Sequence, residues 1–161
     1  MSIKILQWNI NGYINNFHEM QLIIQDINPD VICLQETHFS YHENNIIVPR
    51  GYSGYFSNLP INITSKQGIG ILIKKRIPHR NIPYNLKIAT QCIEVNIDFN
   101  FLIFNSYIPP HQSFSNNDLL SITRNTSLPY LITGDFNSHF GGQICPMKEG
   151  KSLKTILSVK I

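Results

Sequence analysis

The chain has 161 residues, of which 42% are hydrophobic and 14% are charged, and its formal net charge is +3. This composition excludes an intrinsically disordered chain, and the length favours a single domain over residues 1–161 with a buried core. The apolar runs contain only a few residues, far fewer than the ~20 that a membrane-spanning helix needs. The first residues contain no apolar segment typical of a targeting signal, so we expect an intracellular protein that does not cross a membrane.

Three cysteines, Cys33, Cys92 and Cys145, lie far apart in the sequence and form no Cys-x-x-Cys pair. An odd and scattered set argues for a reducing compartment, and against both a disulfide framework and a structural zinc site. The net charge of +3 fits a polyanionic partner but does not require one, because it is weaker evidence than a concentrated basic stripe.

The first part of the chain predicts a strand, an amphipathic helix and a second strand. The first strand covers residues 3–10, and the second, at residues 31–34, is a continuous apolar run typical of a strand covered on both faces. Asn16 and Glu19 have the spacing of a capping box at the start of a helix. The apolar residues of this helix recur at helical spacing: Phe17, Met20, Ile24 and Ile27. This order of elements favours an α/β fold.

The middle of the chain is rich in β-branched and aromatic runs. Strands are predicted at residues 69–75, 91–98 and 101–107. The short connection between the last two predicts a hairpin. Ser115 and Asp118 can cap a short helix, and residues 129–133 predict another buried strand. The last apolar residues share one face of a predicted C-terminal helix: Leu153, Ile156, Leu157 and Ile161.

Two carboxylates differ from the others because each directly follows an apolar strand. Glu36 follows the strand at residues 31–34, and Asp135 follows the strand at residues 129–133. Ligands bind at this edge of open α/β sheets. A carboxylate there is costly to desolvate without a cation or hydrogen-bond donors. Each carboxylate could simply cap the segment that follows it, but two such positions favour a hard cation such as Mg²⁺, which takes one or two protein carboxylates.

Four motifs follow one another along the chain. They are Gln-Trp-Asn-Ile-Asn-Gly at residues 7–12, Leu-Gln-Glu-Thr-His at 34–38, Asn-Ser-Tyr-Ile-Pro-Pro at 105–110 and Gly-Asp-Phe-Asn-Ser-His at 134–139. In this order they resemble the endonuclease/exonuclease/phosphatase superfamily, and most closely the apurinic-like endonuclease domain of non-LTR retrotransposons. The resemblance covers residues 1–139. It implies a DNase I-like fold, which is a two-sheet α/β sandwich with helices outside.

The resemblance implies a metal and phosphate site. Glu36 matches the carboxylate that binds the divalent metal, Mg²⁺ or Mn²⁺. Asn11 matches the amide that orients the metal shell or the phosphate, and Asn9 belongs to the same phosphate-binding set. Tyr107 matches the tyrosine that hydrogen-bonds the scissile phosphate. A structural interpretation competes with these roles, in which either Asn is a turn residue and Tyr107 is a strand aromatic that packs on neighbouring prolines.

Two further residues match groups that act on the reacting atoms. Asp135 matches the residue that activates the attacking water or manages the leaving-group proton, and Asn137 matches the amide that stabilises charge on the pentavalent phosphorus. Phosphodiester hydrolysis needs such charge stabilisation and proton transfer. We expect three nearby histidines to be surface residues: His38, His111 and His139.

The sequence departs from the family after these motifs, because the 161 residues contain no Ser-Asp-His, the family's last motif. Residues 148–157 resemble the helix that follows in the family, so we expect a domain truncated at its C-terminus whose later strands are missing. Residues 3–107 are then expected to supply most of one sheet, and residues 129–135 to begin the other. Residues 129–136 are expected to form an unpaired apolar edge, which favours aggregation.

Three functions are compatible with the sequence. The first is a Mg²⁺-dependent, DNA-nicking endonuclease module of a retroelement, nuclear, with DNA as partner and a reverse-transcriptase region in the same polypeptide. The second is another phosphodiesterase or phosphatase of the superfamily. The third is a catalytically dead remnant that at most binds nucleic acid, as the absence of Ser-Asp-His suggests. The site hypothesis predicts that five side chains line one cleft: Asn11, Glu36, Tyr107, Asp135 and Asn137.

Overall fold

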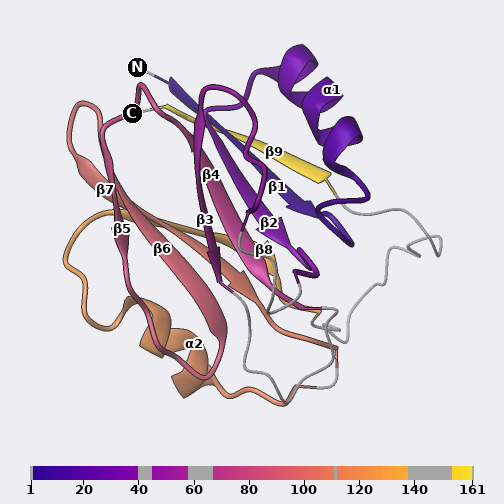
Figure 1. Cartoon of the computed structure of the whole chain (residues 1–161). Helices are drawn as coiled ribbons and strands as arrows, with labels where there is room; N and C mark the ends of the chain where they lie inside the picture. Colours follow the sequence, from indigo (N-terminus) through magenta and orange to yellow (C-terminus); the bar gives the residue numbers. More distant parts are fainter. Residues whose placement is uncertain (1, 40–44, 58–66, 111, 138–153, 161) are drawn as a thin grey trace.

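The computed structural model describes residues 2–39, 45–57, 67–110, 112–137 and 154–160, and its strands form two sheets (Figure 1). The first sheet has the order β3-β4-β2-β1-β9. Its strands are β1 (Ser2–Asn9), β2 (Val31–Gln35), β3 (Tyr52–Ser57), β4 (Ile69–Lys74) and β9 (Lys154–Lys160). The second sheet has the order β5-β6-β7-β8. Its strands are β5 (His79–Ile82), β6 (Ala89–Asn96), β7 (Asn100–Tyr107) and β8 (Tyr130–Asp135).

The sheets pack face to face, and each carries a helix on its outer face: α1 (Phe17–Ile27) and α2 (Asn116–Thr123). The alternation of β1 shows how the layers form. Ile3 and Ile5 belong to the core between the sheets, whereas Leu6 and Trp8 pack on the side of α1. A third apolar cluster joins the second sheet to α2 through Ile122. The predicted two-sheet α/β sandwich is therefore confirmed.

The division of strands between the sheets differs from the prediction that residues 3–107 supply most of one sheet. Strands β5, β6 and β7 belong to the second sheet, so the chain changes sheet between β4 and β5. The predicted hairpin of β6 and β7 is present as an antiparallel pair. Apolar alternation shows that a strand has a buried face, but it is the same in both sheets of a sandwich. The sequence pattern therefore could not assign strands to sheets.

The predicted C-terminal helix is wrong, because residues 154–160 form strand β9. This strand pairs antiparallel with β1 and places Ser2 opposite Lys160 and Trp8 opposite Lys154. A short apolar run that contains Ile156 and Leu157 fits the periodicity of a helix as well as that of a strand, and its β-branched residues favour a strand. Pairing with β9 also covers an edge of β1 that carries buried apolar residues.

The two helix starts differ in how well their capping was predicted. Ser115 and Asp118 form the predicted capping box of α2. Asn16 precedes α1, but its side chain caps nothing in the helix; its amide donates to the carbonyl oxygens of Ile10, Asn11 and Gly12 instead. The predicted cap by the Asn16 side chain is therefore wrong, because the preceding turn offers three carbonyl groups to the same amide.

Strand β8 lies at an edge of the second sheet, and within the described residues only β7 pairs with it. It was predicted to be buried, yet Tyr130 is 52% exposed and Ile132 37% exposed. Cys33 and Cys92 are free thiols in the core, and burial raises the pKa of each to about 12; Cys145 lies outside the described residues. No helix within the described ranges is long and apolar enough to span a membrane.

Candidate active site

Four strands end at one corner of the sandwich, and a polar side chain stands at or just after each end. Asn9 is the last residue of β1, and Glu36 directly follows β2. Tyr107 and Asp135 are the last residues of β7 and β8 and lie opposite each other in the register. Because β1–β2 and β7–β8 are parallel pairs, each pair presents its carboxyl ends at one edge. These ends lie toward the lower right of Figure 1.

A single amide joins the two carboxylates. The Asn9 side-chain nitrogen donates to Glu36 Oε1 at 2.9 Å and to Asp135 Oδ2, also at 2.9 Å. The Tyr107 hydroxyl donates to the same Glu36 Oε1 at 3.0 Å. The site therefore links β1, β2, β7 and β8 across both sheets, and one oxygen of Glu36 receives two donors from the protein.

Asn137 and Asn11 occupy different positions relative to this group. The backbone N–H of Asn137 donates to Asp135 Oδ1 at 3.1 Å, and its side-chain amide donates to the Ile108 carbonyl oxygen. Asn137 is thus held directly beside Asp135. The backbone N–H of Asn11 donates to Asn9 Oδ1, which orients the Asn9 amide, but Asn11 itself is exposed. Its side chain forms no hydrogen bond with another described residue, so the role of Asn11 at the site stays a prediction.

Several residues at this corner have a left-handed backbone. The φ angles are 46° at Asn11, 53° at Glu36, 57° at His38 and 41° at Asn137. Asn and His are among the residues that tolerate this region, whereas Glu adopts it less readily. Such conformations persist only where the surrounding structure enforces them, and they are concentrated at functional sites.

A buried amide network lies beneath the site and connects the two sheets. Gln7 donates to Gln35 at 2.6 Å, and Gln35 donates to Asn105 Oδ1 at 2.6 Å. Asn105 donates in turn to the carbonyl oxygens of Leu34 and Gly70. Gln35 precedes Glu36 and Asn105 lies two residues before Tyr107, so the network fixes the strand ends that carry the site. The motif sequences contain all three amides, but their spacing did not reveal that they bond to one another.

Gly134 allows β8 to approach β7 closely next to the site. Its φ is 148°, and a Cβ atom at this position would lie 1.9 Å from the carbonyl oxygen of Ser106. Only glycine fits such an approach without moving the backbone. The residue that follows is Asp135, so this contact determines where its carboxylate stands.

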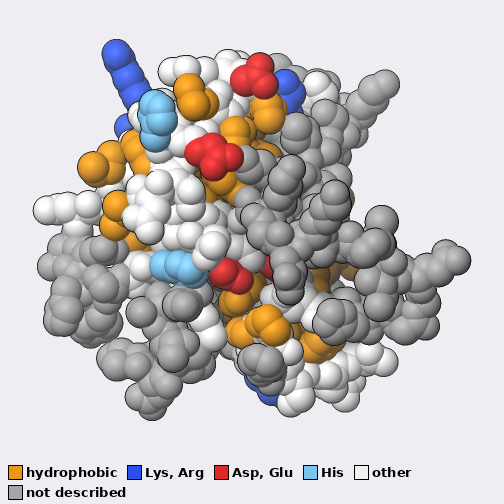
Figure 2. All heavy atoms as spheres, turned by 90° about the vertical axis from the view of Figure 1, so that its right-hand side faces the viewer, with side chains coloured by type: hydrophobic (Ala, Val, Ile, Leu, Met, Phe, Trp, Pro, Cys, Tyr) orange, Lys and Arg blue, Asp and Glu red, His pale blue; other side chains and the backbone are white. Residues whose placement is uncertain are grey.

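Among the residues that the structure describes, the site carries negative charge without a compensating Lys or Arg. Among the described residues, no Lys or Arg forms an ion pair with Glu36 or Asp135. Burial and the negative charge of Glu36, together with its hydrogen bond and the charge of Asp135, hold the pKa of Tyr107 well above its usual value of 10. Tyr107 is therefore a protonated donor at neutral pH. Figure 2 faces this side of the molecule and shows Lys and Arg side chains only toward its margins.

His38 is a residue whose position was predicted wrongly. It was expected at the surface, but its side chain is only 21% exposed and its Nε2 lies 3.6 Å from Glu36 Oε2. The left-handed backbone at His38 turns the ring back toward Glu36, which no spacing rule predicts. His111 and His139 lie outside the described residues.

Within the described ranges, no three His, Cys, Asp or Glu side chains group closely enough to hold a metal ion by themselves. The chemistry nevertheless fits a hard divalent cation, which is bound by one or two carboxylates and keeps water and substrate phosphate as its other ligands. Glu36 Oε2 receives no hydrogen bond from a described residue, and a cation there would offset the repulsion between Glu36 and Asp135.

Comparison with known proteins agrees with this arrangement. Residues 6–145 match the endonuclease/exonuclease/phosphatase family. The chain belongs to this family. It is 26% identical over 145 residues to a probable RNA-directed DNA polymerase from the transposon X-element of Drosophila melanogaster. It is 31% identical over 115 residues to a DNA-(apurinic or apyrimidinic site) endonuclease of Dictyostelium discoideum. These alignments cover 86% and 66% of this chain, but only 15% and 30% of the two relatives.

Several solved structures share the fold. The endonuclease domain of TRAS1, a telomere-specific non-LTR retrotransposon, matches with a TM-score of 0.66 at 13% identity, over 86% of this chain and 62% of that one. The AP endonuclease LMAP from Leishmania major matches with a TM-score of 0.63 at 19% identity, over 83% and 54% of the two chains. The human Nocturnin catalytic domain matches with a TM-score of 0.60 at 18% identity, over 85% and 65%. These structures confirm the DNase I-like sandwich.

Proposed function

We propose that this corner of the sandwich is the active site of a divalent-metal-dependent endonuclease that nicks DNA. The observation that carries the proposal is the pair Glu36 and Asp135, joined by the Asn9 amide and surrounded by neutral donors. A structural pair of carboxylates is normally neutralised by Lys or Arg, because buried negative charge is otherwise costly. A pair that no described Lys or Arg neutralises is suited to a cation that arrives with the substrate.

Glu36 is the residue that would hold Mg²⁺ or Mn²⁺, through the oxygen that Asn9 and Tyr107 leave free. Asn11 stays a prediction as a further contact to the metal shell or the phosphate. When bound, the cation supplies charge neutralisation on the phosphate oxygens. Asn9 and Tyr107 position the Glu36 carboxylate, and their hydrogen bonds keep its other oxygen in place.

The remaining residues act on the phosphate and on protons. Asp135 accepts a proton from the attacking water or passes one to the leaving group, and its orientation comes from Asn9 and from the Asn137 backbone. Asn137 and Tyr107 carry N–H and O–H donors that can contact the phosphate oxygens on which charge develops. Such donors each contribute a factor of about 10² to 10³ to the rate.

The relatives support DNA as the substrate class. One is a transposon polymerase and another is an endonuclease that acts at apurinic or apyrimidinic sites in DNA. We therefore assign the chain to the endonuclease region of a retroelement protein, with a reverse-transcriptase region in the same polypeptide and with its action in the nucleus. The chain spans 15% of the transposon polymerase, which is consistent with one module of such a protein.

The test is nicking of a supercoiled plasmid in Mg²⁺ or Mn²⁺. The 161-residue chain is compared with the same chain joined to the C-terminal segment of a retrotransposon endonuclease domain that carries Ser-Asp-His. We expect the joined chain to nick. The 161 residues alone are expected to be roughly four decades slower, because they provide neither the acid–base help nor the phosphate contact of that motif.

Glu36→Ala and Asp135→Ala in the joined chain are expected to abolish nicking, with His18→Gln on the exposed side of α1 as the matched control. Circular dichroism of each variant verifies that it is folded. A folded joined chain without activity would contradict the proposal, and so would nicking that persists in both alanine variants. Cleavage of a small phosphodiester with an untouched plasmid would instead indicate another branch of the family.

A further inference from the structure

His38 places an unpaired ring nitrogen against the free oxygen of Glu36. Its Nε2 atom is buried and has no hydrogen-bond partner, and it lies 3.6 Å from Glu36 Oε2. The other oxygen of this carboxylate, Oε1, already accepts from Asn9 and Tyr107. These two atoms, neither of which has a hydrogen-bonding partner among the described residues, therefore face each other in the site.

The separation is too long for a direct hydrogen bond. A charge-assisted contact between imidazolium and carboxylate closes to about 2.7–2.9 Å when nothing holds the groups apart. Here the backbone holds them apart, because Glu36 and His38 both have left-handed φ angles and the His38 N–H donates to the Gln67 carbonyl oxygen at 3.1 Å.

The separation instead fits two ligands of one small cation. Ligands about 2.1 Å from a metal lie about 3.4 Å apart in a tetrahedral shell and about 3.0 Å apart in an octahedral one. The observed 3.6 Å is closer to the tetrahedral value. Imidazole nitrogen is a preferred ligand of Zn²⁺ and its neighbours in the transition series, whereas Mg²⁺ prefers oxygen ligands in an octahedral shell.

We propose that His38 Nε2 and Glu36 Oε2 form a nitrogen–oxygen ligand pair, which makes this site bind transition-metal ions such as Zn²⁺ and Co²⁺ more tightly than Mg²⁺. This inference rests on the proposed metal site at Glu36. The His38 and Glu36 side chains are 21% and 22% exposed, so the pair lies close to the surface although the Nε2 atom itself is buried. Water or a substrate phosphate completes the shell, in agreement with the lack of a third protein ligand among the described residues.

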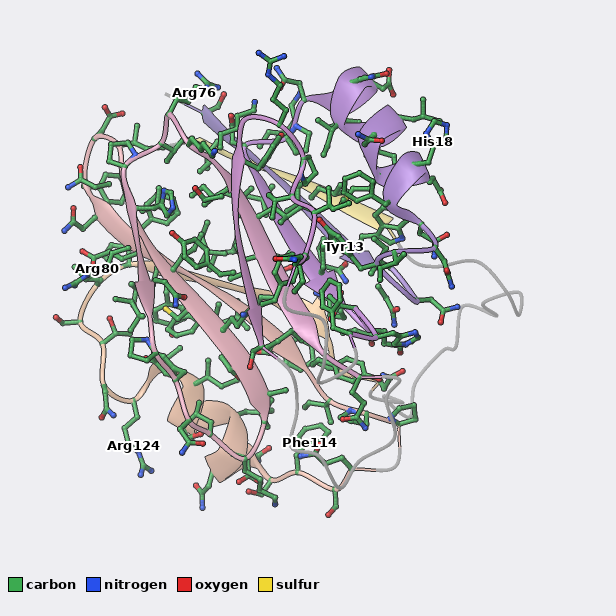
Figure 3. All side chains as sticks on the ribbon, viewed as in Figure 1. Tyr13, His18, Arg76, Arg80, Phe114 and Arg124 are labelled. Carbon is green, nitrogen blue, oxygen red and sulfur yellow. The ribbon has the colours of Figure 1, made fainter. Side chains whose placement is uncertain are left out.

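The experiment measures Co²⁺ binding to the 161-residue chain by the visible absorption of the ion, with Zn²⁺ and Mg²⁺ as competitors. His38→Gln keeps a polar side chain of similar reach but removes the imidazole ligand. We expect this variant to weaken Co²⁺ binding at least about tenfold, the lower bound for groups that merely orient a metal ligand. It is also expected to change the absorption spectrum, while Mg²⁺ affinity stays within about twofold. The control His18→Gln removes an exposed histidine, which Figure 3 shows on the outer side of α1.

The outcomes separate this inference from the proposed function. If Glu36→Gln abolishes Co²⁺ binding but His38→Gln leaves affinity and spectrum unchanged, Glu36 binds metal and the role of His38 is wrong. If the wild-type chain binds no Co²⁺ and no Mg²⁺, or if Glu36→Gln has no effect on either ion, the proposed metal site itself is wrong. Loss of the spectrum in His18→Gln would show that the ion binds elsewhere and would overturn the inference.

Discussion

The two ends of strand β2 carry carboxylates in opposite electrostatic environments. Asp30 precedes β2 and is paired with Lys74 and Arg76, each at 3.0 Å, while the Lys4 backbone N–H donates to its other oxygen. Glu36 follows β2 and meets the neutral donors Asn9 and Tyr107 together with a histidine. Figure 3 shows Arg76 at the top of the molecule, away from the end that carries Glu36.

This contrast separates a structural carboxylate, Asp30, from the carboxylate that we propose to be functional, Glu36. At the Asp30 end the charges are balanced within the protein, so that end needs no ligand. At the Glu36 end the donors can orient a carboxylate but cannot neutralise it. Negative charge is thus left for a cation. Matched substitutions at the two ends are therefore expected to have different effects on metal binding and catalysis.

The largest expected effect is on catalysis, measured in the chain joined to the Ser-Asp-His segment. Glu36→Gln keeps the shape of the side chain but removes its charge, and we expect plasmid nicking to fall by about 10³-fold or more. Asp30→Asn removes a carboxylate of the same strand at its other end, and nicking is expected to stay within about twofold. A gel assay measures nicking by equal amounts of each folded variant. Equal losses of activity in Glu36→Gln and Asp30→Asn would contradict the distinction between the two ends of β2.

The next effect is on stability and concerns the backbone beside Asp135. Gly134→Ala places a methyl group against the Ser106 carbonyl oxygen, and we expect it to lower the free energy of unfolding by at least ~3 kcal/mol. Gly51→Ala is the matched control, because Gly51 also has a positive φ, of 88°, but its Cβ position is open. Its expected cost is about 1–2 kcal/mol, from the backbone alone. Urea unfolding measures both, and a Gly134→Ala cost no larger than that of Gly51→Ala would contradict the close approach.

A smaller effect, on metal binding and stability, is expected from substitution of two tyrosines, one near each end of β2. Tyr107→Phe removes the donor to Glu36, and we expect Mn²⁺ binding to weaken about tenfold, as for other groups that orient a metal ligand. Tyr52→Phe removes the hydroxyl that donates to the Pro29 carbonyl oxygen near Asp30. We expect it to leave Mn²⁺ binding unchanged and to cost about 1 kcal/mol of stability. Calorimetric titration distinguishes the two, and an unchanged affinity in Tyr107→Phe would count against its role.

The smallest expected effect is on the pH dependence of folding stability that Asp30 contributes. Burial alone would raise the pKa of Asp30. The Lys4 N–H, the Lys74 ammonium and the Arg76 guanidinium outweigh burial and hold the pKa below its usual value of 3.8. A lowered folded-state pKa means that Asp30 contributes stability that is fully present above the unfolded value and is lost as pH falls through the folded one. Acid unfolding of Asp30→Asn should therefore lose part of its pH dependence below about pH 4. The exposed control Asp26→Asn should behave as wild type.

How much the sequence predicted depends on whether a feature is local. The capping box at Ser115, the buried run of β2 and the hairpin of β6 and β7 follow from neighbouring residues, and all three are present. The assignment of β5 to β7 to the second sheet depends on packing between distant segments. The apolar pattern of residues 154–160 fits a helix as well as a strand, and these residues form a strand because they pair with β1.

The site follows the same rule. The positions of Glu36 and Asp135 at strand ends were predictable, because a carboxylate that directly follows an apolar strand lies at the sheet edge where ligands bind. Which of Asn9 and Asn11 contacts the carboxylates could not be predicted, because the two amides lie only two residues apart. The exact end of β1 places the Asn9 side chain against them. His38 was missed since its approach to Glu36 depends on two left-handed residues that no sequence pattern indicates.

The central claim is that the end of β2 carrying Glu36 binds a divalent cation and the end carrying Asp30 does not. It is tested most directly by the melting temperature of the 161-residue chain at rising Mn²⁺ concentration. A ligand that binds only the folded state raises this temperature. We predict a rise for the wild-type chain and for Asp30→Asn, and no rise for Glu36→Gln. A melting temperature that Mn²⁺ leaves unchanged in the wild type, or raises equally in Glu36→Gln, would contradict the account.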